Sequence, residues 1–207
     1  SSMFGTFITP RFHVRFAPNE IFSFRLSAGK GYRTVHALAE NNYLLSSGRQ
    51  LVIGDLGQES AWNYSASSAF NIPLFGKTLK LNAEYYYTRF GNQAVIDYDS
   101  DPTQIRIENL SGKSYSNTFQ VDASYPIFTG MELTAAYRIN DVKTTYNGQL
   151  MEKPLTSKYK GLITASYKTP LGKWQFDATL QLNGGGRMPT SYKQTDGTMS
   201  WAERFHP

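Results

Sequence analysis

Residues whose chemistry could support catalysis or metal binding are sparse in this sequence of 207 residues. Cysteine is absent, so the chain offers neither a thiol nucleophile nor a disulfide framework. The three histidines, His13, His36 and His206, lie far apart and show no metal-ligand spacing. The pair Ser46 and Ser47 lacks the context of a nucleophile elbow. We therefore predict no catalytic residue, no metal site and no cofactor, and we do not expect an enzyme.

Aromatic and cationic side chains gather in one segment, between residues 32 and 49. An arginine presents a planar fork of donors that matches carboxylate and catecholate oxygens, and the rings of tyrosine and histidine add hydrogen-bonding groups. The segment is therefore predicted to form a gate that contacts an anionic chelate. Its candidate ligand-binding residues are Tyr32, Arg33, His36, Tyr43 and Arg49.

A second interpretation of the same segment is packing. The apolar stretch from Val35 to Leu45 has near-helical spacing, with Leu38 and Ala39 between its ends. These side chains could pack on neighbouring loops or on a separate plug domain. In that case the segment would be structural.

Charge limits the choice of partner. Asp99, Asp101 and Glu108 could hold a calcium ion, but without EF-hand spacing a solvated acidic loop is the favoured interpretation. The formal net charge is +5, yet the 21 lysines and arginines are spread along the chain and form no basic cluster. We therefore expect no nucleic-acid partner.

The elements that must position these residues are indicated by an alternation of residue type. From Trp174 to Asn183 every second side chain is apolar, and those between are polar. Successive side chains of a strand point to opposite faces, so each such segment has one apolar and one polar face. The pattern recurs in eight predicted strands, at residues 12–16, 22–28, 62–72, 79–87, 115–125, 133–139, 159–167 and 174–182.

Composition favours a membrane as the apolar medium. Aromatic residues with small alanines between them dominate the apolar face, as in outer-membrane strands, which need roughly 9–11 residues to cross. Charges on the polar face suit a wide, wet lumen. Predicted lipid-facing residues are Phe24, Leu26, Tyr64, Phe70, Leu81, Phe119, Leu133, Ile163 and Phe176. Predicted lumen-facing residues are Arg25, Lys80, Glu84, Gln120, Asp122, Arg138 and Asp177. The predicted fold is all-β, with about eight antiparallel up-and-down strands of a larger transmembrane β-barrel.

The connections between the predicted strands differ at the two ends. Short turns rich in Pro, Asn, Gly and Thr fall at residues 17–20, 75–78, 128–131 and 171–173. Long loops fall at residues 33–59, 99–112, 147–156 and after 184. In bacterial outer-membrane barrels the short turns face the periplasm and the long loops face outside. Ligand contacts are therefore predicted in the long loops.

Two runs of sequence resemble a known family. Residues 9–18 (TPRFHVRFAP) and 24–33 (FRLSAGKGYR) are similar to the strand, turn, strand and GxGFR run of TonB-dependent outer-membrane receptors. Residues 54–64 (GDLGQESAWNY) are similar to the LxPExxxNYE run of that family. The sequences of residues 39–41 and 61–64 most resemble those of receptors of the Bacteroidetes. Tyr32 departs from the family's usual Phe, and Thr34 with Val35 stands where Ala-Pro is common.

The resemblance implies active uptake of a scarce ligand across the bacterial outer membrane, such as a ferric siderophore or another metal chelate, haem, or the vitamin cobalamin. It also implies three kinds of partner: the TonB complex, reached through a plug domain; the lipid and lipopolysaccharide of the outer membrane; and the small-molecule ligand. We expect residues 1–207 to be part of a barrel, without plug and terminal strands, because Pro207 does not suit a terminal strand. Three alternatives stay open: a passive porin, a small complete eight-stranded barrel, and a soluble β-sandwich binding module.

Overall fold

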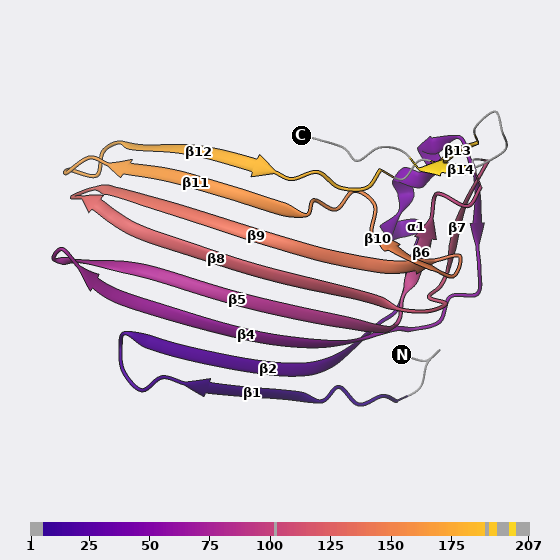
Figure 1. Ribbon diagram of the computed structural model, residues 1–207, viewed down its shortest axis with the longest axis horizontal. Helices are drawn as coiled ribbons and strands as arrows, with labels where there is room; N and C mark the ends of the chain where they lie inside the picture. The colour runs from indigo at the N-terminus through magenta and orange to yellow at the C-terminus, as the bar shows by residue number, and fades with distance from the viewer. Residues whose placement is uncertain (1–5, 102, 189–190, 194–198, 202–207) are drawn as a thin grey trace.

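The computed structural model describes residues 6–101, 103–188, 191–193 and 199–201. One antiparallel sheet carries eight strands that pair successively, with the short β10 (Gln149–Glu152) added on β9 (Figure 1). The eight strands are β1 (Arg11–Phe16), β2 (Phe22–Arg33), β4 (Glu59–Leu74), β5 (Lys77–Asn92), β8 (Ser114–Phe128), β9 (Met131–Tyr146), β11 (Tyr159–Lys168) and β12 (Gln175–Asn183). The predicted up-and-down arrangement is confirmed.

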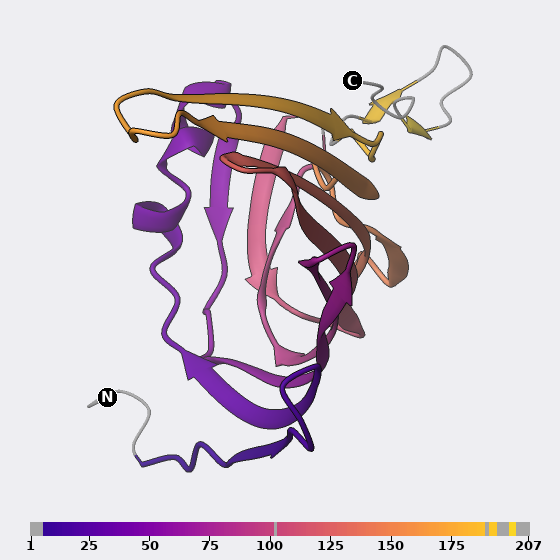
Figure 2. The ribbon, with the colours of Figure 1, turned by 90° about the vertical axis from the view of Figure 1, so that its left-hand side faces the viewer.

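The sheet curves without closing within the described part of the chain. Its edges are β1 and β12, and no pairing joins them. Seen along the strands, the sheet follows an open curve (Figure 2). A complete eight-stranded barrel would pair its first and last strands, and a sandwich would set a second sheet against the apolar face. The described residues form neither arrangement.

Strand register confirms the predicted facing of all sixteen residues. Directly opposed residues of paired strands share a face, because the pleat alternates in step. One apolar row runs through Phe70, Leu81, Ala123, Ala135, Ile163 and Leu180. One polar row runs through Arg25, Ser67, Glu84, Gln120, Arg138 and Lys160.

Cross-strand hydrogen bonds connect the polar face. Asn82 Nδ2 donates to Asp122 Oδ2 at 2.8 Å, and Ser166 Oγ donates to Asp177 Oδ1 at 2.6 Å. The Arg138 guanidinium donates to Oε1 of Gln120, the residue opposite it on β8. These bonds fix side chains on a face that water can reach.

No described helix or strand packs against the apolar face of the sheet. Leu180 and Phe176 are 58% and 60% exposed, and the buried apolar residues among those described lie in the long connections or at the end of β9. They are Leu44, Val95, Ile105, Ile107 and Tyr146. An exposed apolar surface of this extent marks a surface that contacts a membrane or another protein. No helix in the described residues is long and apolar enough to span a membrane, a result that does not bear on crossing by strands.

Tight turns join the strands at one end. Asn19 Oδ1 accepts hydrogen bonds from the backbone amides of Ile21 and Phe22, which closes the β1–β2 turn. Phe75 and Gly76 both have positive φ, as a two-residue hairpin turn requires. The predicted short turns are therefore present. We call this end of the strands the turn end.

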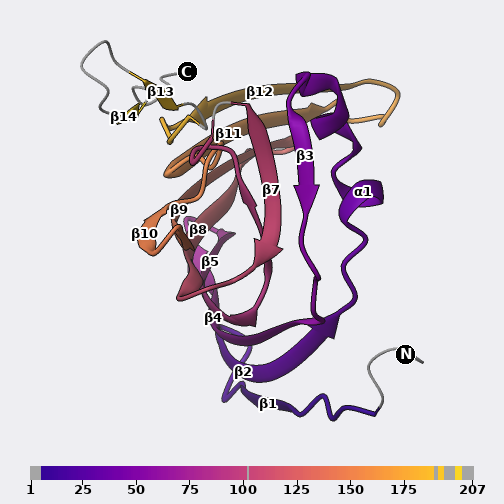
Figure 3. The same ribbon diagram turned by 90° about the vertical axis from the view of Figure 1, so that its right-hand side faces the viewer.

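The long connections fold into a layer of their own at the opposite end of the strands, which we call the loop end. It contains α1 (Ala37–Glu40), a 3₁₀ helix (Asn42–Ser47) and a small sheet in the order β3-β7-β6. These strands are β3 (Gln50–Ile53), β6 (Ala94–Asp97) and β7 (Gln104–Asn109). In Figure 3, β7, β3 and α1 lie on the concave side of the curved sheet. We call these elements the loop layer.

The loop layer has a small hydrophobic core, which corrects the predicted packing of residues 35–45. Leu44, Ile105 and Ile107 are its buried members, and Ala37 packs against them. Leu38 and Leu45 instead remain 52% and 65% exposed. The segment does pack on a neighbouring loop, but through different residues, because it forms two short helical turns and not one continuous helix.

Residues 147–156 also differ from the predicted long loop. Asn147 and Gly148 have φ of 45° and 80° and turn β9 back into β10. Asn-Gly is a strong hairpin signal, so the sequence contained this turn. Beyond β12 the structure describes β13 (Ser191–Lys193) and β14 (Met199–Trp201). His206 and Pro207, used in the sequence argument, lie outside the described residues.

Candidate ligand-binding layer at the loop end

Two of the five predicted site residues meet on Tyr98. The hydroxyls of Tyr43 and Tyr98 are 2.9 Å apart, and Arg49 Nη1 donates to the Tyr98 carbonyl at 3.0 Å. Tyr43 lies in the 3₁₀ helix, Arg49 directly precedes β3, and Tyr98 directly follows β6. The pairing of β3 with β7, and of β7 with β6, brings these segments together. We call Tyr43, Arg49 and Tyr98 the Tyr–Arg cluster.

Arg33 and His36 belong to a separate ion-pair group. Arg33 contacts Glu40 at 2.9 Å and Glu59 at 2.7 Å, so its charge is balanced by two carboxylates. The backbone amide of His36 donates to Glu40 Oε1 at 3.2 Å, and Glu59 Oε1 accepts from the amide of Ala94. This group ties the end of β2 to α1, β4 and β6. Its geometry is that of a structural clamp.

Tyr32 lies on the other face of the sheet. In β2 it follows Lys30 at a spacing of two, and Lys30 pairs with Trp62 on the apolar face. The Lys30 ammonium lies 4.9 Å from the centre of the Tyr32 ring, and the Phe7 ring lies 4.8 Å away. Tyr32 is therefore directed away from the Tyr–Arg cluster.

Asp99 anchors the loop layer and does not join the other acids. Arg187 Nη1 contacts Asp99 Oδ2 at 2.5 Å and its Nε donates to the Glu152 carbonyl at 2.7 Å. Burial raises the pKa of the Asp99 carboxyl, while Arg187 opposes that shift. Within the described ranges, no three His, Asp or Glu side chains come together as a metal site would require. The calcium interpretation of Asp99, Asp101 and Glu108 therefore has no support in the described structure.

A cavity of about 240 Å³ opens beside the Tyr–Arg cluster, between the loop layer and the hairpin of β9 and β10. Polar groups from Tyr43, Gln93, Tyr98 and Lys153 line it. Burial, and then the hydrogen bond with Tyr43, raise the pKa of the Tyr98 hydroxyl, so it stays protonated at neutral pH. Ligand pockets usually hold about 300–1,000 Å³, so this cavity is smaller than a usual pocket for a whole ligand.

The polar face of the strands continues into this region. Ser114 Oγ donates to Gln93 Oε1 at 2.7 Å and lies 3.0 Å from Thr144 Oγ1. Both Ser114 and Thr144 are 3% exposed, and Gln93, the Ser114 partner, directly precedes β6. The loop layer thus stands over the polar, concave face of the sheet.

Sequence reasoning missed Tyr98, Gln93 and Arg187. One signal was available: residues 104–109 (QIRIEN) alternate Ile105 and Ile107 with polar residues, which indicates a strand. A strand there would have placed the preceding turn, and Tyr98 with it, in an ordered layer. Arg187 carried no local signal, because its partners lie 88 and 35 residues away in sequence.

Comparison with known proteins accounts for both the fold and its two faces. Residues 1–204 match the family model described as TonB dependent receptor-like, beta-barrel. The chain belongs to the TonB-dependent receptor β-barrel family. Among solved structures, the FrpB iron transporter from Neisseria meningitidis (F3-3 variant) is similar with a TM-score of 0.60 at 15% identity. No curated protein sequence matches the chain.

The match to the FrpB structure covers 95% of this chain and 30% of the FrpB chain. At that identity the likeness shows the fold alone. Family membership places this TonB-dependent receptor barrel in the bacterial outer membrane. Its apolar face then meets lipid, its polar face lines the lumen, and the loop end is directed outward.

Proposed function

We propose that the full-length receptor takes up a scarce anionic chelate, such as a ferric siderophore, with energy supplied through the TonB complex. One observation carries the choice of ligand class: the loop layer holds the Tyr–Arg cluster over the polar face at the outward end. An arginine and paired tyrosine hydroxyls suit the carboxylate and catecholate oxygens of such chelates. The FrpB neighbour is described as an iron transporter, which agrees with this class.

The proposed ligand contacts are narrower than the five predicted ones. Tyr43 and Arg49 are retained and Tyr98 is added, because these residues share one cluster beside a cavity. Arg33 already contacts two carboxylates, and Tyr32 lies on the lipid face. We infer that His36 contributes through its backbone to the clamp. Haem and cobalamin remain the other ligand types that the family resemblance implies.

Further strands and a plug complete the proposed transporter. β1 and β12 each leave one edge of the sheet without a partner among the described strands. An unpaired strand edge cannot face the bilayer core, because each unsatisfied backbone group there costs several kcal/mol. We therefore propose a larger barrel, with a plug that contacts the TonB complex. The likeness of residues 39–41 and 61–64 to Bacteroidetes receptors stays a prediction.

The test is growth of a host that lacks other iron receptors, supplied with a ferric tricatecholate as the only iron source. Full-length receptor carrying Arg49→Gln and Tyr43→Phe should lower whole-cell binding of the chelate about tenfold, since lost charge-assisted hydrogen bonds weaken affinity. Lys173→Gln, in a turn at the opposite end, is the matched control and should bind as wild type. Binding is normalised to folded receptor in the membrane.

Two results would contradict the proposal. Wild-type binding by the double variant would remove the Tyr–Arg cluster from the ligand site. Uptake that persists after removal of the TonB complex would favour the passive porin.

A further inference from the structure

The lipid face carries a row of alternating cations and aromatic rings at the loop end. Directly opposed residues on five consecutive strands form it: Lys30, Trp62, Arg89, Tyr115 and Lys143. Neighbouring strands lie about 4.8 Å apart, so successive cations are separated by about 10 Å. Four residues nearer the turn end, the same face carries Leu26, Ala66, Tyr85, Phe119 and Ile139. The face thus changes from apolar to cationic within a short distance.

A groove of about 680 Å³ lies in this row. Three cations line it, Lys30, Arg89 and Lys113, together with the rings of Trp62, Tyr64, Tyr87 and Tyr115. The rings form a continuous series: Trp62 and Tyr64 are 6.0 Å apart, Tyr64 and Tyr87 6.2 Å, and Tyr87 and Tyr115 6.5 Å. Aromatic rings of this kind mark the level of the lipid headgroups.

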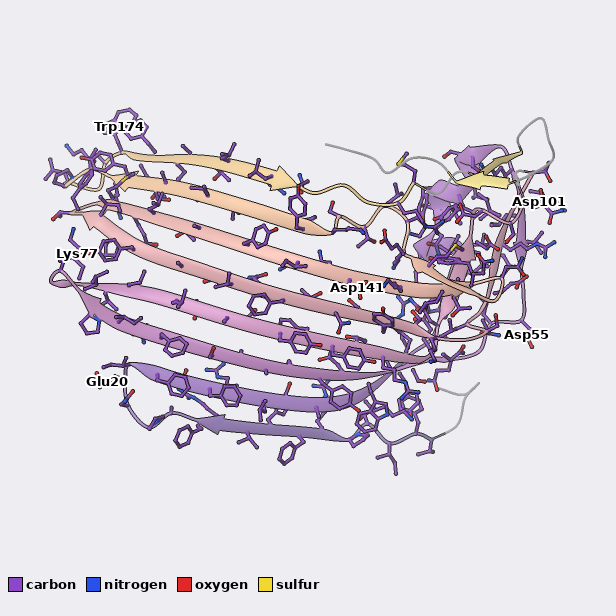
Figure 4. The ribbon with its side chains drawn as sticks, in the orientation of Figure 1. Glu20, Asp55, Lys77, Asp101, Asp141 and Trp174 are labelled. Carbon is purple, nitrogen blue, oxygen red and sulfur yellow. The ribbon has the colours of Figure 1, made fainter. Side chains whose placement is uncertain are left out.

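The positive charge of the groove is not balanced by the protein. Within the described residues, no ion pair is formed by Lys30, Arg89 or Lys113. Asp141, a described carboxylate on the same face, contacts Lys143 at 3.4 Å and accepts a hydrogen bond from the Tyr115 hydroxyl. Asp141 lies toward the loop end of β9 (Figure 4). The three cations that line the groove are therefore available to an anionic group from outside the protein.

We propose that this groove binds the phosphate groups of the lipopolysaccharide headgroup in the outer leaflet. Lysine and arginine are the phosphate-binding side chains, and the loop end is directed toward the leaflet that contains this glycolipid. The acyl chains would then lie along the apolar rows below the groove. The proposal rests on family membership and the outer-membrane location, and it is independent of the transported ligand.

The test uses delipidated full-length receptor in detergent, with lipid A carrying both phosphates as the probe. Wild type should bind this probe about tenfold more tightly than dephosphorylated lipid A, and the triple variant Lys30→Gln, Arg89→Gln, Lys113→Gln should lose that preference. The control is Arg25→Gln, Lys80→Gln, Lys160→Gln, which removes three cations from the lumen face and should bind as wild type. Heat-modified gel migration verifies that each barrel is folded.

Three outcomes would overturn the proposal. The triple variant could bind phosphorylated lipid A as tightly as wild type, or the lumen control could lose as much affinity. Competition by millimolar inorganic phosphate would indicate a free-phosphate site instead of a lipid site. Growth on the ferric chelate is a separate readout, so failure here leaves the proposed uptake function intact.

Discussion

The eight-stranded sheet and the loop layer hide their apolar side chains in different places. The sheet leaves residues such as Phe176 and Leu180 exposed on one face, and the membrane must cover them. The loop layer buries Leu44, Ile105 and Ile107 in a core made by the protein itself. One chain therefore uses two apolar media, lipid for the strands and its own side chains for the loops. Substitutions in the two regions should differ accordingly.

The largest expected effect is in the core of the loop layer. Ile107 is completely buried, so Ile107→Ala should cost this layer about 2–5 kcal/mol, the usual range for such a truncation. Leu45→Ala, at a residue 65% exposed, should change its stability by less than about 0.5 kcal/mol. Hydrogen exchange of the β3, β6 and β7 amides in the full-length receptor measures both. Loss of protection in the barrel strands as well would contradict the claim that the loop layer is stabilised independently of the sheet.

A smaller effect is expected in the turns, where register is set without a core. Gly76 has φ of +73° with open space around it, so Gly76→Ala should cost about 1–2 kcal/mol from the left-handed backbone alone. Gly130 has φ of +88°, and an added Cβ would overlap the Lys168 carbonyl oxygen. Gly130→Ala should therefore cost more than Gly76→Ala in equilibrium unfolding in lipid. Equal costs would remove the steric argument.

The smallest effect concerns pH and the exposed turn before β7. Hydrogen bonds from the Thr103 hydroxyl and amide, at 2.6 and 2.7 Å, lower the pKa of the Asp101 carboxyl. Because the pKa of this carboxyl is lowered, its ionised form stabilises the turn at pH values above the ordinary pKa of an aspartate. This stabilisation is lost as the pH falls below about 4. The Thr103 amide resonance should titrate with a midpoint below that value and should not titrate in Asp101→Asn. A midpoint at the ordinary Asp value would contradict the assignment.

The sheet could be predicted from the sequence because its signal is local. Period-two alternation needs only neighbouring residues, and register then follows from turns such as residues 75–76. All eight strands and both faces were obtained in this way. The chemistry of the faces was predictable too, since lipid and water select residue types directly.

The loop layer could not be predicted in the same way because its contacts are distant. β3 pairs in parallel with β7, which joins Gln50 to Gln104, and short strands carry little pattern. Tyr43 and Arg49 could be selected by residue type, but their shared partner Tyr98 lies 55 and 49 residues away. Arg33 looked equally suitable, and only packing shows its two glutamate partners.

The central claim is that one face of the sheet meets lipid while the other lines a wet lumen. Adjacent residues of β12 test it directly: Leu180 pairs with Ile163 on the apolar face, and Gln181 pairs with Leu162 on the polar face. Reversible unfolding of the full-length receptor in lipid vesicles should show a loss of about 2–4 kcal/mol for Leu180→Arg and little change for Gln181→Arg. Equal penalties at the two positions would contradict the assignment of the faces.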